Sequence, residues 1–320
     1  MVVQCRSGES TWGEKRLSFV LAILCAWAAA MGPAVRAEDW PMYRHDAARS
    51  GVTSEELAFP LEACWVFRPL FGPKAAWGDP KPDPVEGYLE LRRMHFDDVF
   101  QVAVAGGGVY FGSSSDNKVY CLALETGQPR WSSITGGPIR LSPTVVDGRV
   151  YVGSDDGCVY CLGAADGTVV WKFQAAPADD RVLGNGRMIS LWPVRTGVLV
   201  DGGVAYFGAG IFPAEGVFLY GVDAATGKEF WRNDTCGEVP QSRISPQGYL
   251  LASATTLYVP RGRVSPAAFD RATGQLKYET YFGKAFGGAY ALLAEEAVYT
   301  GTEAMVAFKA DTRDRFAVFA

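Results

Sequence analysis

The chain has 320 residues, of which 48% are hydrophobic, 13% aromatic and 20% charged. Abundant aromatic residues and glycines with few charges are typical of β-sheet proteins, in which broad rings pack on a pleated surface. The formal net charge of −5 gives no general attraction for a polyanion and argues against nucleic acid as a partner.

The first 37 residues have the pattern of an export signal peptide. Lys15 and Arg16 precede an apolar run over 17–31, and Val35 and Ala37 fit the small-residue positions of a cleavage site. The apolar run is shorter than the roughly 20 residues that span a bilayer. We therefore expect cleavage after Ala37 rather than a membrane anchor, and a mature chain that is periplasmic or extracellular with no transmembrane segment.

Residues 38–98 lack a regular pattern and are expected to lead into the repeats that follow. Residues 38–62 are predicted to be irregular, and 61–67 to form a single outer strand without the rest of its sheet. Residues 70–98 contain Pro73, Pro80, Pro82 and Pro84, which exclude a regular strand, so this segment is predicted to be a long surface loop.

Residues 99–320 repeat one pattern five times. An alternating apolar strand with a central tyrosine recurs at Tyr110, Tyr151, Tyr206, Tyr258 and Tyr299. A period near 40 residues with insertions predicts an all-β fold, a β-propeller of four-stranded antiparallel blades. The blades are expected at 99–134, 138–175, 196–234, 246–283 and 287–320. A second long loop is expected at 176–195, between the second and third blades.

Each of the first four repeats ends in a glycine turn followed four residues later by an aromatic residue. The pairs are Gly127 with Trp131, Gly167 with Trp171, Gly227 with Trp231, and Gly274 with Tyr278. The fifth copy lacks the glycine. Glycine supplies the positive φ of a tight turn. The ring lies on the outer strand, where its flat face can cover the turn of a neighbouring blade and so dock the two sheets together.

Five cysteines follow the expected cleavage site, so at least one thiol stays unpaired in a monomer. Cys158 and Cys161 are spaced like a metal or redox pair. However, they lie in an alternating strand, where a spacing of three places them on opposite faces. Core packing of Cys161 is therefore expected.

The turn pattern of Ala or Asp, Thr-Gly and Trp resembles the pyrroloquinoline-quinone-like (PQQ-like) β-propeller repeat family. The opening segment from Trp40 to Asp46, with Arg49 and Gly51, also looks like the start of bacterial members of this family. The resemblance covers most of residues 38–320. Because such propellers commonly have seven or eight blades, it implies either an incomplete larger ring or, as the alternative, a closed ring of five. The family includes quinoprotein dehydrogenases and non-catalytic proteins similar to the assembly factor BamB.

The segments that enter the innermost strands are expected near the central funnel. The candidate ligand-binding residues there are His95, Arg140, Trp192, Arg195, Arg243 and Gln247. Arginines beside an aromatic ring bind carboxylates or planar ligands through paired hydrogen bonds and stacking. The alternative is that these arginines bond only to carbonyls at the blade edges.

No catalytic residue and no metal site is predicted. His45 and His95 are the only histidines, and neither has the context of a nucleophilic triad or of zinc ligands. The resemblance to quinoproteins implies PQQ, calcium, a catalytic Asp and often a disulfide between adjacent cysteines, but the sequence has no adjacent pair. We therefore expect an exported binding or scaffolding module without a cofactor, for a protein or an extended polymer. A PQQ-dependent dehydrogenase and the docking half of a larger enzyme are the alternatives.

Overall fold

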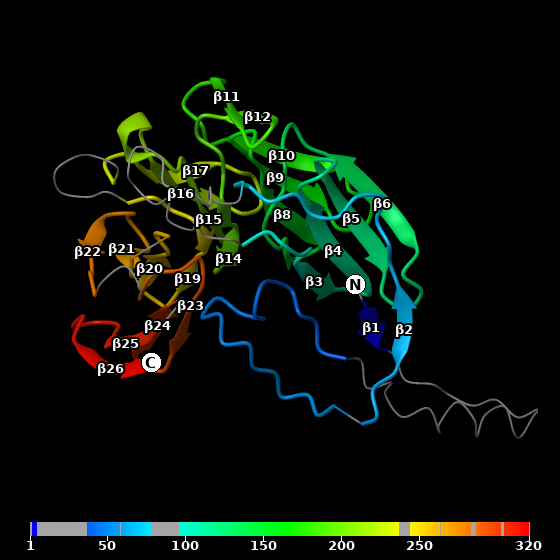
Figure 1. The fold of residues 1–320 in the computed structure, drawn as a ribbon, viewed down its shortest axis with the longest axis horizontal. Coiled ribbons are helices and arrows are strands. Elements are labelled where there is room, and N and C mark those ends of the chain that lie inside the picture. The colour runs from blue at the N-terminus through cyan, green and yellow to red at the C-terminus, as the bar shows by residue number, and fades with distance from the viewer. Residues whose placement is uncertain are drawn as a thin grey trace, which may run out of the picture.

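The computed structural model describes residues 2–4, 37–57, 59–78, 96–236, 244–262, 264–282, 286–301 and 304–319. These residues form five four-stranded antiparallel sheets, each built from consecutive strands of the chain. The sheets follow one another along an arc, with the first strand of each sheet on the concave side (Figure 1). The predicted β-propeller with about five blades is thus confirmed.

The strands of each blade follow one another in chain order from the innermost to the outermost. Blade 1 contains β3 (Val102–Ala105), β4 (Gly108–Ser113), β5 (Lys118–Ala123) and β6 (Pro129–Ile134). Blade 2 contains β7 (Thr144–Val146), β8 (Arg149–Gly153), β9 (Cys158–Gly163) and β10 (Val169–Gln174). Blade 3 contains β14 (Leu199–Asp201), β15 (Val204–Ala209), β16 (Phe218–Asp223) and β17 (Glu229–Asn233). Blade 4 contains β19 (Leu251–Ala252), β20 (Thr256–Val259), β21 (Ala267–Asp270) and β22 (Leu276–Tyr278). Blade 5 contains β23 (Ala291–Ala294), β24 (Ala297–Gly301), β25 (Met305–Lys309) and β26 (Arg315–Phe319).

Among the described residues, six further strands and one short helix lie outside the blades. They are β1 (Val2–Gln4), which pairs with β2 (Ala63–Val66), the hairpin of β11 (Arg181–Gly184) and β12 (Arg187–Ser190), the parallel pair of β13 (Thr196–Gly197) and β18 (Gly248–Tyr249), and the 3₁₀ helix η1 (Pro213–Glu215). The expected signal peptide lies almost entirely outside the described residues.

The segment 176–195 is not simply the long loop that was predicted. It contains the antiparallel hairpin β11–β12, which projects beyond the blades (Figure 1). Asn185 and Gly186 between its strands both have positive φ, at 46° and 76°. This is the conformation that a two-residue hairpin turn requires, and Asn-Gly is the sequence that adopts it most readily.

The hydrophobic core lies between neighbouring blades. Val159 of blade 2 and both Phe207 and Val222 of blade 3 belong to one cluster, and all three are fully buried. Each blade therefore buries its apolar residues against the next blade, as expected for sheets that are stable only when stacked.

An aromatic side chain crosses each junction between blades. Trp131 of blade 1 donates its indole N–H to Ala164 O of blade 2 at 3.0 Å, and its ring lies over Gly167. The same arrangement joins Trp65 to Leu124 O, Trp171 to Ala224 O, Trp231 to Arg271 O and Tyr278 to Ala310 O. Trp65 lies on β2, so this strand, which is outside the five blades, covers one flank of blade 1.

The outer strand of blade 5 departs from this pattern. Ala317 stands where the docking aromatic occurs in the other blades, and Arg313, with φ of 67°, occupies the glycine position. Tyr299 is half-buried, whereas the corresponding tyrosines of blades 1–4 are buried. One flank of the last blade is therefore not covered by the described residues.

The lead-in segment runs along the inner strands of the arc. Trp40 exchanges two backbone hydrogen bonds with Val104 of β3, at 2.7 and 2.8 Å. The carbonyls of Pro41, Ala47 and Ala48 then accept hydrogen bonds from Val145 of β7, Ala252 of β19 and Leu293 of β23. Residues 40–48 therefore satisfy backbone donors on the innermost strands of blades 1, 2, 4 and 5, and they place this part of the chain on the concave side.

Candidate functional site

Two buried arginines converge on one carboxylate near the concave side of blades 1–3. Arg140 precedes β7, Asp155 lies in the turn between β8 and β9, and Arg195 directly precedes β13. Arg140 Nε donates to Asp155 Oδ2 at 2.6 Å. Arg195 Nε and Nη2 donate to the two oxygens of the same carboxylate, each at 3.0 Å. Rigid blade strands thus fix both guanidinium groups around Asp155.

Asp97 is the fourth charged member of this group, which we call the axial ion cluster (Asp97, Arg140, Asp155 and Arg195). Asp97 comes from the insertion before blade 1, and its Oδ2 lies 2.6 Å from Arg140 Nη1. No side chain in the cluster is more than 3% exposed. Two positive and two negative charges therefore balance each other away from water, as buried ions must.

The two carboxylates of the cluster have different electrostatic environments. Burial raises the pKa of Asp155, but Arg195 and Arg140 together outweigh burial and hold the pKa below its ordinary value. Burial also raises the pKa of Asp97, and in this case the attraction of Arg140 does not offset it. The ionised form of Asp97 is therefore held less firmly than that of Asp155.

The sequence predicted a mainly cationic funnel, but the structure pairs its two central arginines with Asp97 and Asp155. Sequence reasoning missed both acids because Asp155 lies in a short turn between two strands and Asp97 in a segment that was predicted to be a surface loop. The signal that could have found them is chemical, since an arginine at the axis of a packed fold needs a nearby counter-ion.

The other predicted ligand-binding residues are not gathered with these arginines. Trp192 is buried in the core between blades 2 and 3 and donates its indole N–H to Glu215 O at 2.5 Å. Gln247 is half-buried and donates its amide to Ser245 Oγ at 3.0 Å. His95 and Arg243 lie outside the described residues. Of the four predicted residues that the structure describes, it therefore brings Arg140 and Arg195 together and leaves Trp192 and Gln247 apart from them.

A stack of tyrosine rings fills the space next to the axial ion cluster. The rings of Tyr43 and Tyr249 lie 3.8 Å apart and are nearly parallel, and Tyr290 stacks on Tyr43 at 5.6 Å. The hydroxyl of Tyr249 accepts a hydrogen bond from the backbone N–H of Ser142 at 2.6 Å and donates one to Gln101. Planar groups of the chain itself thus occupy this part of the concave side.

Arg49 of the lead-in segment is also buried beside this stack. Its guanidinium carbon lies 5.7 Å from the centre of the Tyr249 ring, and its Nε donates to Leu250 O at 2.8 Å. Burial lowers the pKa of Arg49 to about 10. Its hydrogen bonds go to backbone carbonyls, which anchor the lead-in segment against blade 4.

Residues 72–78 cover the axial ion cluster and are called the cap segment. Arg140 Nη1 donates to Lys74 O at 2.8 Å, and the N–H of Lys74 donates to Ser114 Oγ at 2.8 Å. The ring of Trp77 lies 4.8 Å from the guanidinium carbon of Arg195. Ala76 and Phe96 are buried, so the insertion 70–98 is in part folded inwards and is not wholly the surface loop that was predicted. The physical reason is that the insertion supplies buried Arg140 with two acceptors, the carbonyl of Lys74 and the carboxylate of Asp97.

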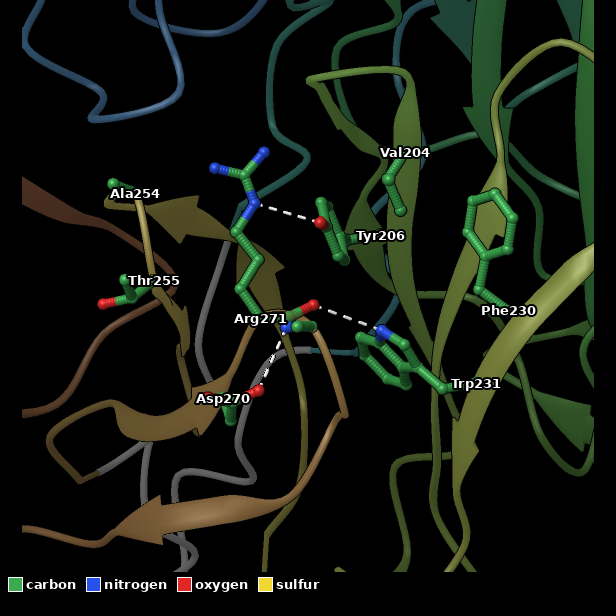
Figure 2. Close-up of a pocket in the computed structure, with 9 residues that line it drawn as sticks. Val204, Tyr206, Phe230, Trp231, Ala254, Thr255, Asp270 and Arg271 are labelled. Carbon is green, nitrogen blue, oxygen red and sulfur yellow. Dashed lines mark hydrogen bonds between the residues drawn. The ribbon is translucent and has the colours of Figure 1, made fainter.

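A cleft of about 400 Å³ lies at the junction of blades 3 and 4, away from the axial ion cluster. Figure 2 shows the residues that line it: Val204, Tyr206, Phe230, Trp231, Ala254, Thr255, Asp270, Arg271 and Ala272. We call it the junction cleft. The guanidinium of Arg271 is directed away from Trp231 and donates to Tyr206 Oη at 2.9 Å and to Ser253 O at 3.0 Å.

Two positions at the junction cleft differ from those of the neighbouring junctions. At the junction of blades 2 and 3, Arg149 stands in the place of Val204 and reaches the turn of the next blade at Ala224 O. At the junction of blades 4 and 5, Lys277 stands in the place of Phe230 and bonds to Thr256 at 2.8 Å. Val204 and Phe230 cannot make such contacts, and Phe230 is 57% exposed.

Within the described residues, no group of three or more His, Cys, Asp or Glu side chains is placed to hold a metal ion. A helix long and apolar enough to cross a bilayer was also not found in this part of the chain.

The comparisons with known proteins place the repeats in a family context. Residues 93–217 match the family model described as outer membrane protein assembly factor BamB. A tetrathionate hydrolase of Acidithiobacillus ferrooxidans is 28% identical over 45% of this chain and 29% of its own length. The quinohemoprotein alcohol dehydrogenase ADH-IIG of Pseudomonas putida is 29% identical over 45% of this chain and 19% of its own length. BamB of Salmonella typhimurium is 25% identical over 50% of this chain and 41% of its own length. The chain therefore spans less than half the length of these curated relatives.

Solved structures show the same fold. BamB of Moraxella catarrhalis aligns with a TM-score of 0.51 at 17% identity over 67% of this chain and 61% of its own. The quinohemoprotein alcohol dehydrogenase of Comamonas testosteroni aligns with a TM-score of 0.56 at 16% identity over 88% of this chain and 48% of its own. The resemblance to the PQQ-like propeller repeat is thus confirmed, and the relatives include both an assembly factor and redox enzymes.

Proposed function

We propose that this chain, whose repeats are similar to those of BamB and of quinohemoprotein dehydrogenases, is an exported propeller that binds a protein or an extended polymer without catalysis. The observation that carries the proposal is the junction cleft. It is built on two rigid sheets, and it presents the exposed ring of Phe230 beside Val204 and Trp231. An open apolar cleft with a few polar groups at its edge is the form that a recognition site takes on a folded scaffold.

The concave side supports a binding role rather than a redox role. Tyr43, Tyr249 and Tyr290 stack on one another there, and the 3.8 Å separation of Tyr43 and Tyr249 leaves no space for a further ring between them. The carboxylates of Asp97 and Asp155 are both engaged by arginines. These residues do not fit a planar quinone held with calcium, because the rings and the acids that would hold it already bond within the chain.

Export and partner class are part of the proposal. The signal pattern over 1–37 would deliver the chain to the periplasm or beyond, and the relative from Salmonella typhimurium is described as an outer membrane protein assembly factor. A role beside an exported polypeptide agrees with both. Blade docking by Trp131, Trp171, Trp231 and Tyr278 would then serve to hold the binding surface rigid.

A quinoprotein dehydrogenase is the second candidate, and the 29% identity with the quinohemoprotein alcohol dehydrogenase of Pseudomonas putida over 45% of this chain favours it. The chain could also be the docking half of a larger enzyme. An assay separates these possibilities from the first. Purified chain is titrated with PQQ and calcium and tested for dye-linked alcohol oxidation. We expect no turnover, and saturable uptake with turnover would overturn the proposal.

The junction cleft is tested with a matched pair of variants. Peptides selected on the immobilised chain from a random display library are measured for affinity against Phe230→Glu and Phe316→Glu. Phe316 occupies the same strand position in blade 5 and is similarly exposed, at 54%. Phe230→Glu is expected to weaken binding at least tenfold because a carboxylate replaces an apolar contact, whereas Phe316→Glu should not. Equal effects of the two variants would exclude the cleft as the binding site.

A further inference from the structure

We infer that Arg140 and Arg195 form a carboxylate-binding site, that Asp97 occupies this site within the chain, and that an acidic side chain of a polypeptide partner takes the place of Asp97. The inference rests on the proposed binding function and adds the chemistry of the partner. It concerns the concave side and not the junction cleft.

The fixed part of the site is cationic. Arg140, Asp155 and Arg195 are all held by segments that enter or connect blade strands, and they make three hydrogen bonds with one another at 2.6–3.0 Å. Without Asp97, the two guanidinium groups and the carboxylate of Asp155 would have a net charge of +1 in the interior of the protein. A second carboxylate is therefore needed for this part of the molecule to stay charged and dry.

Asp97 supplies that carboxylate from outside the blades. It belongs to the insertion before blade 1, and it receives one guanidinium hydrogen bond, from Arg140 Nη1 at 2.6 Å, and a backbone hydrogen bond from Ala76, whereas Asp155 receives three guanidinium hydrogen bonds. The pKa of Asp97 is raised by burial, so its charge is the less stable of the two. The insertion thus contributes a carboxylate that is bound more weakly than the one built into the blades.

The guanidinium of Arg195 has capacity for a further acceptor. Its Nη1 has no hydrogen-bond partner among the described residues, although the side chain is only 1% exposed. A buried donor without an acceptor is unfavourable, because it has lost its hydrogen bond to water and gained none in return. A carboxylate has two oxygens, and one placed between Arg140 and Arg195 would bond to both guanidinium groups where Asp97 bonds to one.

The occupant present in the structure indicates the form of the partner. Asp97 is an aspartate on a polypeptide, and it enters beside the cap segment, in which Trp77 lies over Arg195 and Lys74 O accepts from Arg140. An acidic residue in an extended segment has the same charge and the same reach. Because Asp97 competes for the same arginines, the insertion acts as a built-in competitor that a stronger acidic ligand displaces.

The first experiment uses acetate to replace a missing side chain. Asp97→Ala should melt several degrees below the wild type because it leaves Arg140 without its second carboxylate. Sodium acetate should restore much of that loss, and sodium chloride at equal ionic strength should not. The double variant Asp97→Ala with Arg195→Ala should lose the response. Asp179→Ala is the control, since Asp179 is exposed and pairs with Arg181, outside the cluster. Equal effects of acetate and chloride on Asp97→Ala would overturn the site.

The second experiment uses a variant that leaves no cavity at position 97. Asp97→Asn keeps the size of the side chain and an oxygen for Arg140 but removes the competing charge. A fluorescent ten-residue poly-glutamate peptide should bind this variant at least tenfold more tightly than the wild type, and an equally long poly-lysine peptide should not bind. Unchanged poly-glutamate affinity would exclude an acidic polypeptide as the occupant, as would saturable binding of PQQ, itself a carboxylic acid, in its place. Neither result would alter binding at Phe230, so the proposed function is judged separately.

Discussion

The indole ring of Trp131 lies against Gly167 of the next blade, so closely that a Cβ atom at Gly167 would stand 2.7 Å from Cδ2 of the ring. The same ring donates its N–H to Ala164 O in that turn. Stacking of the blades therefore depends on a glycine that has both a positive φ and no side chain.

Gly167→Ala is expected to destabilise the fold more than the same change at a turn without a covering ring. Gly167 has φ of 71° and meets Trp131, whereas Gly148 has φ of 70° and no atom within 4 Å of the position that a Cβ would take. Gly148→Ala should cost about 1 kcal/mol of unfolding free energy from backbone strain alone. Gly167→Ala should cost about 2–4 kcal/mol, since the ring must also move. Urea denaturation measures both, and equal costs would show that the ring gives way freely.

Only part of this blade junction is predictable from the sequence. The spacing of Gly167 and Trp171 predicts a turn and an outer-strand ring, and a ring four residues after a glycine turn indicates docking. The turn that each ring covers, however, cannot be predicted from the residues around the ring. Trp171 covers Gly227 of the following blade, and Trp65 of β2, a strand outside the blades, covers Gly127. Such pairings depend on the order in which sheets stack, which no short sequence window contains.

The axial ion cluster was predictable only in part. Arg140 and Arg195 each precede an inner strand, so their approach to the concave side follows from the repeat. The pairing of Arg140 with Asp97 does not, because Asp97 belongs to an insertion without periodicity and folds inwards only through contacts with residues far along the chain. The course of the lead-in segment was equally hidden, since its bonds to Val104, Ala252 and Leu293 are made by backbone atoms.

The hydrogen bonds that Trp171 and Tyr151 donate to one carbonyl are expected to be energetically coupled. The indole N–H of Trp171 and the hydroxyl of Tyr151 both donate to Ala224 O at 3.0 Å. Trp171→Phe and Tyr151→Phe should each cost about 1 kcal/mol, because the carbonyl keeps one good donor. The double variant should cost more than the sum, since only Arg149 Nη1 at 3.4 Å remains. A double-mutant cycle in urea measures the coupling, and additive costs would contradict it.

Asp155→Asn is expected to be among the most destabilising single substitutions. The change leaves Arg140 and Arg195 with Asp97 as their only carboxylate in the cluster, and an unbalanced buried charge costs about 3–5 kcal/mol. The control is Asp179→Asn, because Asp179 is exposed in its pair with Arg181 and should cost less than about 1 kcal/mol. A loss at Asp155 no larger than at Asp179 would mean that water reaches the cluster.

Acid should weaken the fold through the same carboxylate. The folded-state pKa of Asp155 lies below its ordinary value of 3.8, so its contribution is complete above that value and is lost as the pH falls through the lower folded-state pKa. Asp97 acts in the opposite sense: its pKa is raised on folding, so protonation of Asp97 favours the folded state. Unfolding free energy measured between about pH 6 and 3 should fall less steeply for Asp155→Asn than for the wild type. It should fall more steeply for Asp97→Asn, and parallel curves would contradict both assignments.

Thiol reactivity should divide the cysteines by burial. Cys64 is exposed on β2, whereas Cys158 and Cys161 are buried in β9. Burial raises the pKa of both thiols to about 11, so few thiolates form near pH 8 and the alkylating agent has little access. Iodoacetamide applied to the native chain should label Cys64 first, and Cys158 and Cys161 should react only in denaturant. Peptide mass spectrometry identifies the labelled sites, and Cys64→Ser provides the control. Rapid native labelling at Cys161 would mean that the junction between blades 2 and 3 opens, because this thiol lies in the core that Trp171 and Tyr151 close.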